Sequence, residues 1–150
     1  LLRHHDPGFQ KLVETVANLA TSTGQWPEAI HPITGGGCMG DGQHGWAAAE
    51  WIMIIRNMFV REENDCLILF SGVFPSWLDS KEDISFGPTL TPYGPVSVSL
   101  QKNEGEIFAT VDGQWRNKPS QLIIAAPGYE KMHVFDASKP LRLQPITNNL

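Results

Sequence analysis

The chain has 150 residues, of which 41% are hydrophobic and 18% are charged, and its formal net charge at pH 7 is −5. A chain of this size can bury one ordinary hydrophobic core, or a small core and part of a second one. Because the net charge is negative and no block of Lys and Arg stands out, neither a nucleic acid nor a membrane is an expected partner.

The first predicted helix begins after Asp6 and Pro7, since Asp can cap a first turn and Pro fits the first helical position. The residues between Thr21 and Gly24 end it. Its apolar residues follow helical spacing on one face only: Phe9, Leu12, Val13, Val16, Leu19 and Ala20. A one-sided helix of this kind is expected to lie on the outside of a larger helical assembly.

A long glycine-rich loop follows, from Gln25 to His44. Six glycines lie between Gly35 and Gly45, and a loop of this length inside a compact fold is usually functional or disordered. Sugar pockets need flat apolar surfaces, groups that hydrogen-bond to hydroxyls, and carboxylates that move protons. The loop and the start of the next helix offer all three kinds: Trp26, Trp46 and Trp51; Gln25, His31, Thr34, Gln43 and His44; and Glu28 and Asp41.

These residues also have structural interpretations. Glu28 can be a surface carboxylate after a proline turn, Asp41 is better explained as a helix cap or turn residue, and Trp51 as a core residue. The glycine run lacks the Lys-Ser/Thr pair of a phosphate loop, so a nucleotide site is rejected. A zinc site is not favoured either, because the residues of ligand type have the spacing of no standard site: His31, Cys38 and His44. No metal and no cofactor is therefore predicted.

The second predicted helix starts near Gly45 and Trp46 and runs to about Glu62. Apolar residues occupy almost every side of it, so it must be buried on all sides, and one outer helix cannot cover it. We therefore expect further partner helices, from a longer chain or another copy. The chain begins with Leu rather than Met, which also suggests that its true N-terminus lies elsewhere. The apolar run is too short to span a bilayer.

From Cys66 onward the sequence predicts short strands separated by turn residues: Leu67–Phe70, Ile84–Phe86, Val96–Gln101, Glu106–Val111, Leu122–Ala125, Met132–Phe135 and Leu141–Leu143. This spacing is typical of an antiparallel sandwich. The predicted domains are therefore residues 1–63, which are helical, and residues 64–150, which are strands. The two cysteines, Cys38 and Cys66, are interpreted as reduced thiols.

The segment from Trp26 to Trp51 reads WPEAIHPITGGGCMGDGQHGWAAAEW. It is similar to the last active-site segment of six-hairpin, or (α/α)6-toroid, glycosidases, above all the trehalase and processing α-glucosidase group and its bacterial and archaeal relatives. The matching stretches are Trp26-Pro27-Glu28, Pro32-Ile33-Thr34-Gly35 and His44-Gly45-Trp46. The stretch Gly-Gly-Gly-Cys-Met-Gly-Asp-Gly departs from the eukaryotic pattern of that group.

The resemblance implies an α+β chain: the last helical hairpin of an (α/α)6 toroid, then a small antiparallel β-sandwich like the one that follows the toroid in many such enzymes. It implies that Glu28 is the general base of an inverting glycoside hydrolase, and that the general acid lies outside this chain. The predicted substrate-binding residues are Trp26, His31, Thr34, Gln43, His44 and Trp46. The implied partners are a carbohydrate substrate and the rest of the toroid domain, and the isolated 150-residue chain is expected to be inactive.

Three alternatives stay open. A related toroid phosphorylase would have a phosphate site in place of the base, and a carboxylate at that position argues against it. The strand-rich half by itself is compatible with a non-catalytic carbohydrate-binding or structural module, although such a module has no need of a helix pair joined by a long glycine loop. A helical interaction domain that dimerises through its apolar helix is the third alternative.

Overall fold

The computed structural model describes residues 2, 7–40 and 42–147, and the chain divides into two compact units after Ile55. Unit 1 contains helix α1 (Gly8–Asn18), the short strands β1 (Ala29–Ile30) and β2 (Gly37–Met39), and the greater part of helix α2 (Gly45–Phe59). Helices and antiparallel sheets occur together, so the α+β class is confirmed. The toroid remains a prediction.

Helix α1 agrees with the predicted element in position and in its one-sided character. Pro7 occupies the N-cap position, whereas the predicted cap residue Asp6 lies outside the described residues. The helix ends at Asn18, and Gly24 then adopts a φ of 74°, which glycine tolerates and most residues do not. Thus the turn residues after the helix end it as predicted.

Helix α2 ends at Phe59, so the expected continuation to Glu62 is wrong. Residues Val60–Glu63 form strand β3 instead, which pairs antiparallel with strand β4 (Cys66–Leu69). Asn64 between them has a φ of 52°, a left-handed conformation in which Asn is common. An apolar run does not by itself reveal where a helix changes into a strand, because the same run fits either element. Here the pairing of β3 with the following strand β4 decides it.

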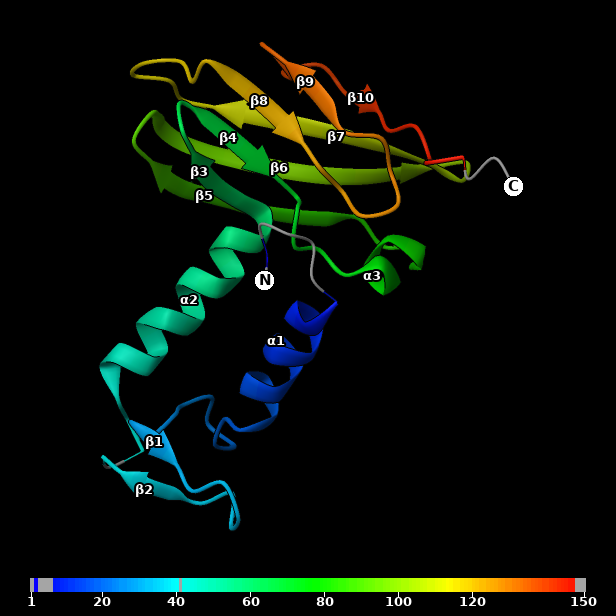
Figure 1. The fold of residues 1–150 in the computed structure, drawn as a ribbon. Coiled ribbons are helices and arrows are strands. Elements are labelled where there is room, and N and C mark those ends of the chain that lie inside the picture. Colours follow the sequence, from blue (N-terminus) through cyan, green and yellow to red (C-terminus); the bar gives the residue numbers. More distant parts are fainter. Residues whose placement is uncertain (1, 3–6, 41, 148–150) are drawn as a thin grey trace. The chain divides into compact units, whose positions relative to one another are not determined.

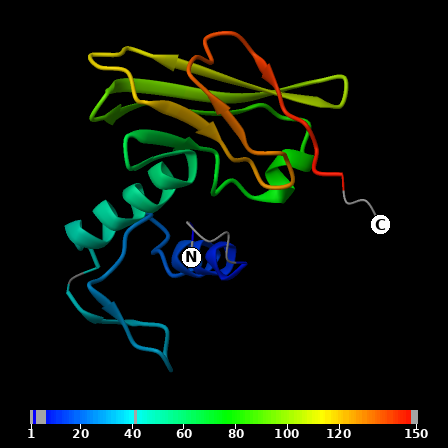
Figure 2. The same cartoon turned by 45° about the horizontal axis from the view of Figure 1, so that its top comes forward.

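Unit 2 consists mainly of two four-stranded sheets that form two layers, as Figures 1 and 2 show. One sheet has the order β10-β7-β6-β5 and the other has the order β3-β4-β8-β9. The remaining elements are helix α3 (Pro75–Asp79) and the strands β5 (Ile84–Thr91), β6 (Gly94–Asn103), β7 (Glu106–Gly113), β8 (Gln121–Ile124), β9 (Met132–Val134) and β10 (Leu141–Arg142).

The seven predicted strands are therefore present, but the sandwich is not wholly antiparallel. Strand β4 pairs with β8 in parallel, with Leu67 opposite Leu122 and Leu69 opposite Ile124. Between these two strands the chain passes through the other sheet, and such a crossover lets it return in the same direction. Hairpins alone would have produced the antiparallel pairing that the sequence suggested.

The hydrophobic core lies in unit 2. All of the largest fully buried side chains belong to it: Met58, Val60, Leu67, Leu69, Phe70, Val73, Val96, Leu100, Ile124 and Leu143. In unit 1 the buried apolar residues among those described are Val13, Trp26 and Pro27. This explains why unit 2 begins before residue 64: the last turn of α2 and strand β3 already contribute to the core between the sheets.

None of the described helices has the length and apolar character needed to cross a membrane.

Candidate functional site

The glycine-rich loop folds into a small hairpin that returns to its own starting point. Strands β1 and β2 pair antiparallel, and the backbone N–H of Glu28 donates to the carbonyl of Met39 at 3.0 Å. The N–H of His44 donates to the carbonyl of Trp26 at 2.9 Å. The two hydrogen bonds place Trp26 and Glu28 beside the segment that enters α2, so the predicted catalytic carboxylate and the predicted aromatic residues meet at the base of one hairpin.

Gly40 allows this close return. Its φ is 73°, and a Cβ added there would lie 3.2 Å from the backbone nitrogen of Glu28 and 3.4 Å from its Cβ. The side chain of Glu28 is exposed and makes no hydrogen bond or ion pair with another described residue. Its carboxylate is therefore held by the backbone but open to water and to a ligand. Asp41, expected to act as a cap or turn residue, lies outside the described residues.

Trp26 is a packing residue of unit 1. Only 9% of it is exposed, its indole N–H donates to the carbonyl of Val16 at 2.7 Å, and its ring centroid lies 5.3 Å from that of Trp51. A buried indole with its donor satisfied joins α1 to α2. Trp26 thus positions Glu28, two residues later, and does not offer an open ring face to a sugar. Trp51 is partly buried, in line with its interpretation as a core residue.

The half-buried His44 and the exposed Trp46 lie side by side where α2 begins. Their ring centroids lie 6.4 Å apart with an interplanar angle of 36°. Trp46 is 71% exposed, and its indole N–H donates to Glu50 at 3.3 Å. His44 Nδ1 accepts from the backbone N–H of Ala47 at 3.4 Å, as a cap of α2. A neutral His44 therefore carries its proton on Nε2, which can donate to a ligand hydroxyl.

His31 and Thr34 lie at the opposite end of the hairpin. His31 donates its backbone N–H to Gly36 at 2.8 Å, and its Nδ1 accepts from Ile33 and Thr34 at 3.3 Å each. Both residues thereby stabilise the turn. The strand between Glu28 and His31 is extended, so about 10 Å of backbone separates them. Gln43 is exposed in the segment that leads into α2. Backbone hydrogen bonds therefore bring the segments of Glu28 and His44 to the base of the hairpin, with Trp46 two residues after His44, whereas His31 and Thr34 lie at the turn.

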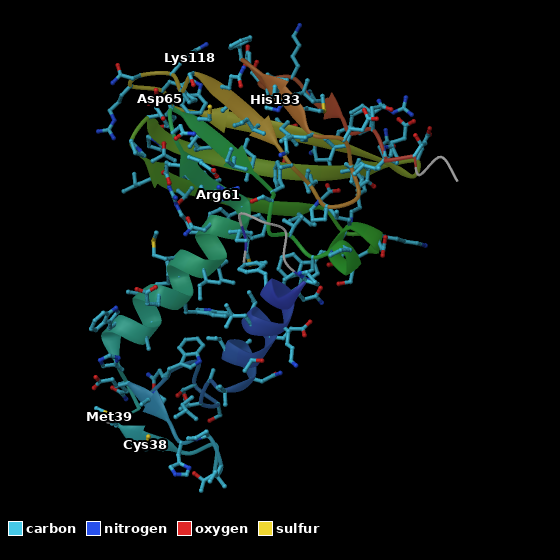
Figure 3. All side chains as sticks on the ribbon, in the orientation of Figure 1. Cys38, Met39, Arg61, Asp65, Lys118 and His133 are labelled. Atoms are coloured by element: carbon cyan, nitrogen blue, oxygen red, sulfur yellow. The ribbon has the colours of Figure 1, made fainter. Side chains whose placement is uncertain are left out.

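The electrostatic character of this segment is acidic. Residues 25–55 contain no Lys or Arg, whereas they contain the carboxylates of Glu28, Asp41 and Glu50. Such a surface disfavours phosphate and other anions. Within the described residues, no group of three or more His, Cys, Asp or Glu is placed to hold a metal ion. Both cysteines are free, and Figure 3 shows Cys38 beside Met39 at the hairpin.

A concave site in unit 2 was not predicted from the sequence. A pocket of about 530 Å³ lies on the β5-β6-β7 sheet, and its lining includes Ser97, Ser99, Thr110 and Asp112. The Thr110 hydroxyl is buried and has no hydrogen-bond partner among the described residues. An unpaired buried hydroxyl costs about 1–3 kcal/mol. The alternation Val96-Ser97-Val98-Ser99 predicts that the serines lie on the outer face of the strand, but it does not predict that this face contains a pocket.

Comparison with known proteins found no significant match, whether to a protein-family model, to a curated protein or to a solved structure. The resemblance of residues 26–51 to toroid glycosidases therefore stays a prediction.

Proposed function

We propose that this chain supplies the general-base carboxylate, Glu28, and part of the sugar-binding surface of an inverting glycoside hydrolase. One observation carries the proposal: the exposed, unpaired Glu28 lies at the base of the hairpin, where the backbone N–H of His44 bonds to Trp26 and where the half-buried His44 and the exposed Trp46 lead into α2. An exposed indole suits the apolar face of a pyranose, and a free carboxylate can accept a proton from water.

In this mechanism Glu28 removes a proton from the water that attacks the anomeric carbon. A carboxylic acid on the other side of the sugar protonates the leaving oxygen, and in inverting enzymes the two carboxyl groups are about 6.5–9.5 Å apart. The Nε2–H of His44 donates to a sugar hydroxyl, and the ring of Trp46 supports the sugar ring. Trp26 and Gly40 position the base through the backbone contacts that fix the hairpin.

The proposal places the general acid and the remaining toroid helices in a larger catalytic domain. Helix α2 supports this arrangement, because its apolar residues Ile52 and Met53 are exposed, Ile52 by 65%. A helix with apolar residues on nearly all sides is stable in water only when other elements cover it. We propose that neighbouring toroid helices cover α2 and complete the pocket beside Glu28.

The proposal is tested by Glu28→Gln in the protein that contains the complete catalytic domain. Loss of a general base lowers kcat by about 10²–10⁴-fold, whereas sugar binding should persist because the amide keeps the shape of the side chain. Hydrolysis of an aryl α-glucoside measures kcat, and calorimetric titration with maltose measures binding. The matched control is Glu14→Gln, an exposed residue of α1 whose side chain accepts a hydrogen bond from Gln10, and it should retain full activity.

Undiminished turnover in the Glu28→Gln protein would remove the proposed role. Hydrolysis by the 150-residue chain alone would contradict the proposal in another way, since the general acid is placed outside it. A glycoside phosphorylase is distinguished by cleavage that depends on phosphate. The absence of Lys and Arg from residues 25–55 favours the hydrolase.

A further inference from the structure

The pocket of unit 2 is built where strand β5 is interrupted. The pairing of β5 with β6 shifts register between Phe86 and Thr89, at the Gly87-Pro88 step. A Cβ added to Gly87, whose φ is 123°, would lie 2.7 Å from the carbonyl oxygen of Val96. Only glycine therefore permits this bulge, and the bulged residues line the pocket on the β5-β6-β7 sheet.

Hydroxyl side chains cross this hollow in register. Ser85 pairs with Ser99, and Ser99 pairs with Thr110, so three hydroxyl residues form one row across β5, β6 and β7. In the next row Ser97 pairs with Asp112. Ser97 and Ser99 alternate with buried residues of β6, which puts them on the face away from the core. All five residues line the pocket.

These polar groups are not used by the fold. The Thr110 hydroxyl is buried and unpartnered among the described residues. The side chains of Ser97, Ser99 and Asp112 likewise form no hydrogen bond with another described residue. Buried polar groups in proteins are normally paired, so the Thr110 hydroxyl is the group whose partner is missing, whereas the more exposed Ser97, Ser99 and Asp112 can bond to water. A ligand seated in the pocket can supply the missing partner of Thr110 after a rotation about χ1.

The lining defines the chemical class of the ligand. No Lys, Arg or His lines the pocket, and Asp112 adds a negative charge, so an anion is excluded. A single carboxylate is a poor site for Ca²⁺, which takes several charged oxygen ligands. Hydroxyls that both donate and accept, next to a carboxylate that only accepts, match a neutral molecule rich in hydroxyl groups. The pocket volume lies within the range of about 300–1,000 Å³ that is usual for small-molecule sites.

We propose that this pocket is a non-catalytic binding site for a neutral saccharide. Asp112 accepts hydrogen bonds from sugar hydroxyls, and the hydroxyls of Ser97, Ser99 and Thr110 exchange further hydrogen bonds with the sugar. This site is separate from Glu28 and does not depend on the proposed hydrolase function. All residues that form it belong to unit 2. The two proposals can therefore fail independently.

The test is a titration of the ¹⁵N-labelled 150-residue chain with glucose, maltose, cellobiose and xylobiose, followed by NMR. We expect saturable shifts for at least one sugar, confined to residues 85–89, 97–99 and 110–112. Asp112→Asn should weaken this binding about tenfold or more, because a hydrogen bond to a charged group is lost. Ser99→Leu should abolish it by filling the pocket from an outward-facing position. The matched control is Glu82→Gln, which removes the same charge from an exposed residue outside the pocket and should bind as the unmodified chain does.

Three results would overturn the proposal. The first is that none of the four sugars causes saturable shifts in the pocket. The second is that shifts appear only in residues 26–46, which would support the Glu28 site and leave the unit 2 pocket without a role. The third is that spermidine or inorganic phosphate shifts the pocket residues whereas the sugars do not. If the Ser99→Leu variant does not fold, Asp112→Asn still tests the binding proposal, since it changes one exposed side chain without changing its size.

Discussion

Two tryptophans of the same sequence motif have different roles in the structure. The sequence pattern assigns both Trp26 and Trp46 to a sugar pocket, and nothing in the local composition separates them. The structure buries Trp26 against Val16 and Trp51, while Trp46 stays exposed beside His44. In the proposed hydrolase, direct contact with a sugar therefore falls to Trp46, and Trp26 acts as a positioning residue for Glu28.

Another residue-scale feature links the stability of unit 2 to pH. Arg56, which is 8% exposed, donates to both carboxylate oxygens of Glu62 at 2.6 and 2.5 Å and to the carbonyl of Leu90 at 2.9 Å. Burial raises the pKa of Glu62, but the hydrogen bonds and positive charge of Arg56 outweigh burial, so the net pKa is lowered below 4.5. The carboxylate thus stabilises the folded state in its ionised form.

Because the folded-state pKa of Glu62 is lowered, the stability of the fold falls as the pH falls. The contribution of Glu62 is fully present above the unfolded-state pKa and is lost as the pH falls through the folded-state value, below 4.5. We expect Glu62→Gln to lower the free energy of unfolding near pH 7 by about 1–3 kcal/mol, because Arg56 loses its charged partner, and to flatten the acid dependence. Urea denaturation from about pH 3 to about pH 7 measures the free energy of unfolding and its dependence on pH.

The control for this prediction is Glu106→Gln. Glu106 also pairs with an arginine, Arg142, at 2.6 Å, but both side chains are exposed. Exposed pairs contribute about 0–1 kcal/mol, so this variant should change stability and acid dependence little. Equal effects of the two substitutions would contradict the role assigned to burial of the Arg56 pair.

At the scale of the elements, two glycine turns join β5 to β6 and β6 to β7. Gly94 has a φ of 129°, and a Cβ there would lie 2.1 Å from the carbonyl oxygen of Gln114. Gly105 has a φ of 85° with nothing within 4 Å of an added Cβ. The backbone of Gln114 cannot move aside easily, because its N–H donates to Pro95 at 2.8 Å. The first turn is thus restricted by space as well as by conformation.

The matched pair Gly94→Ala and Gly105→Ala separates these two effects. Gly105→Ala should cost about 1–2 kcal/mol, the penalty of a left-handed conformation. Gly94→Ala should cost clearly more, because the clash adds to the same kind of penalty, and it should loosen the sheet that carries the proposed saccharide pocket. Urea denaturation of both variants measures the difference in their free energies of unfolding. Equal decreases would show that the backbone near Gln114 shifts to accommodate the added methyl group.

At the scale of the whole molecule, the core is distributed very unequally. The fully buried large side chains all belong to unit 2, whereas unit 1 buries Val13, Trp26 and Pro27 among its described apolar residues and exposes several others. Stability depends mainly on buried apolar surface. Unit 2 has the core of an independent domain, and unit 1 has the surface of an element that other helices cover in the proposed catalytic domain.

This difference predicts the behaviour of the separate units. A chain of residues 56–150 should fold by itself and give a dispersed NMR spectrum with cooperative urea unfolding. A peptide of residues 7–55 should show little stable tertiary structure, because one tryptophan contact cannot offset the entropy of ordering the chain. A well-dispersed spectrum of the peptide alone would remove the argument that unit 1 requires further helices.

Local patterns in the sequence were sufficient for the first helix, the seven strands from Cys66 onward and the α+β class, because helical spacing, strand alternation and turn residues act over short distances. They failed where pairing with another strand decides the structure, whether that strand follows directly, as for β3, or lies far away in sequence, as for β8. Helix α2 gives way to β3 because β4 pairs with it, and β8 joins β4 in parallel because the chain crosses to the other sheet in between.

The candidate sites show the same difference between what the local sequence predicted and what tertiary contacts decided. Composition alone drew attention to Glu28 and the aromatic residues of the glycine loop, since residue types limit the chemistry that a segment can perform. Only the tertiary structure separated the exposed Trp46 from the buried Trp26, placed His31 at the far turn, and brought Ser85, Ser99 and Thr110 into one row. Burial and cross-strand neighbours arise from contacts between residues far apart in the chain, and local sequence patterns do not encode those contacts.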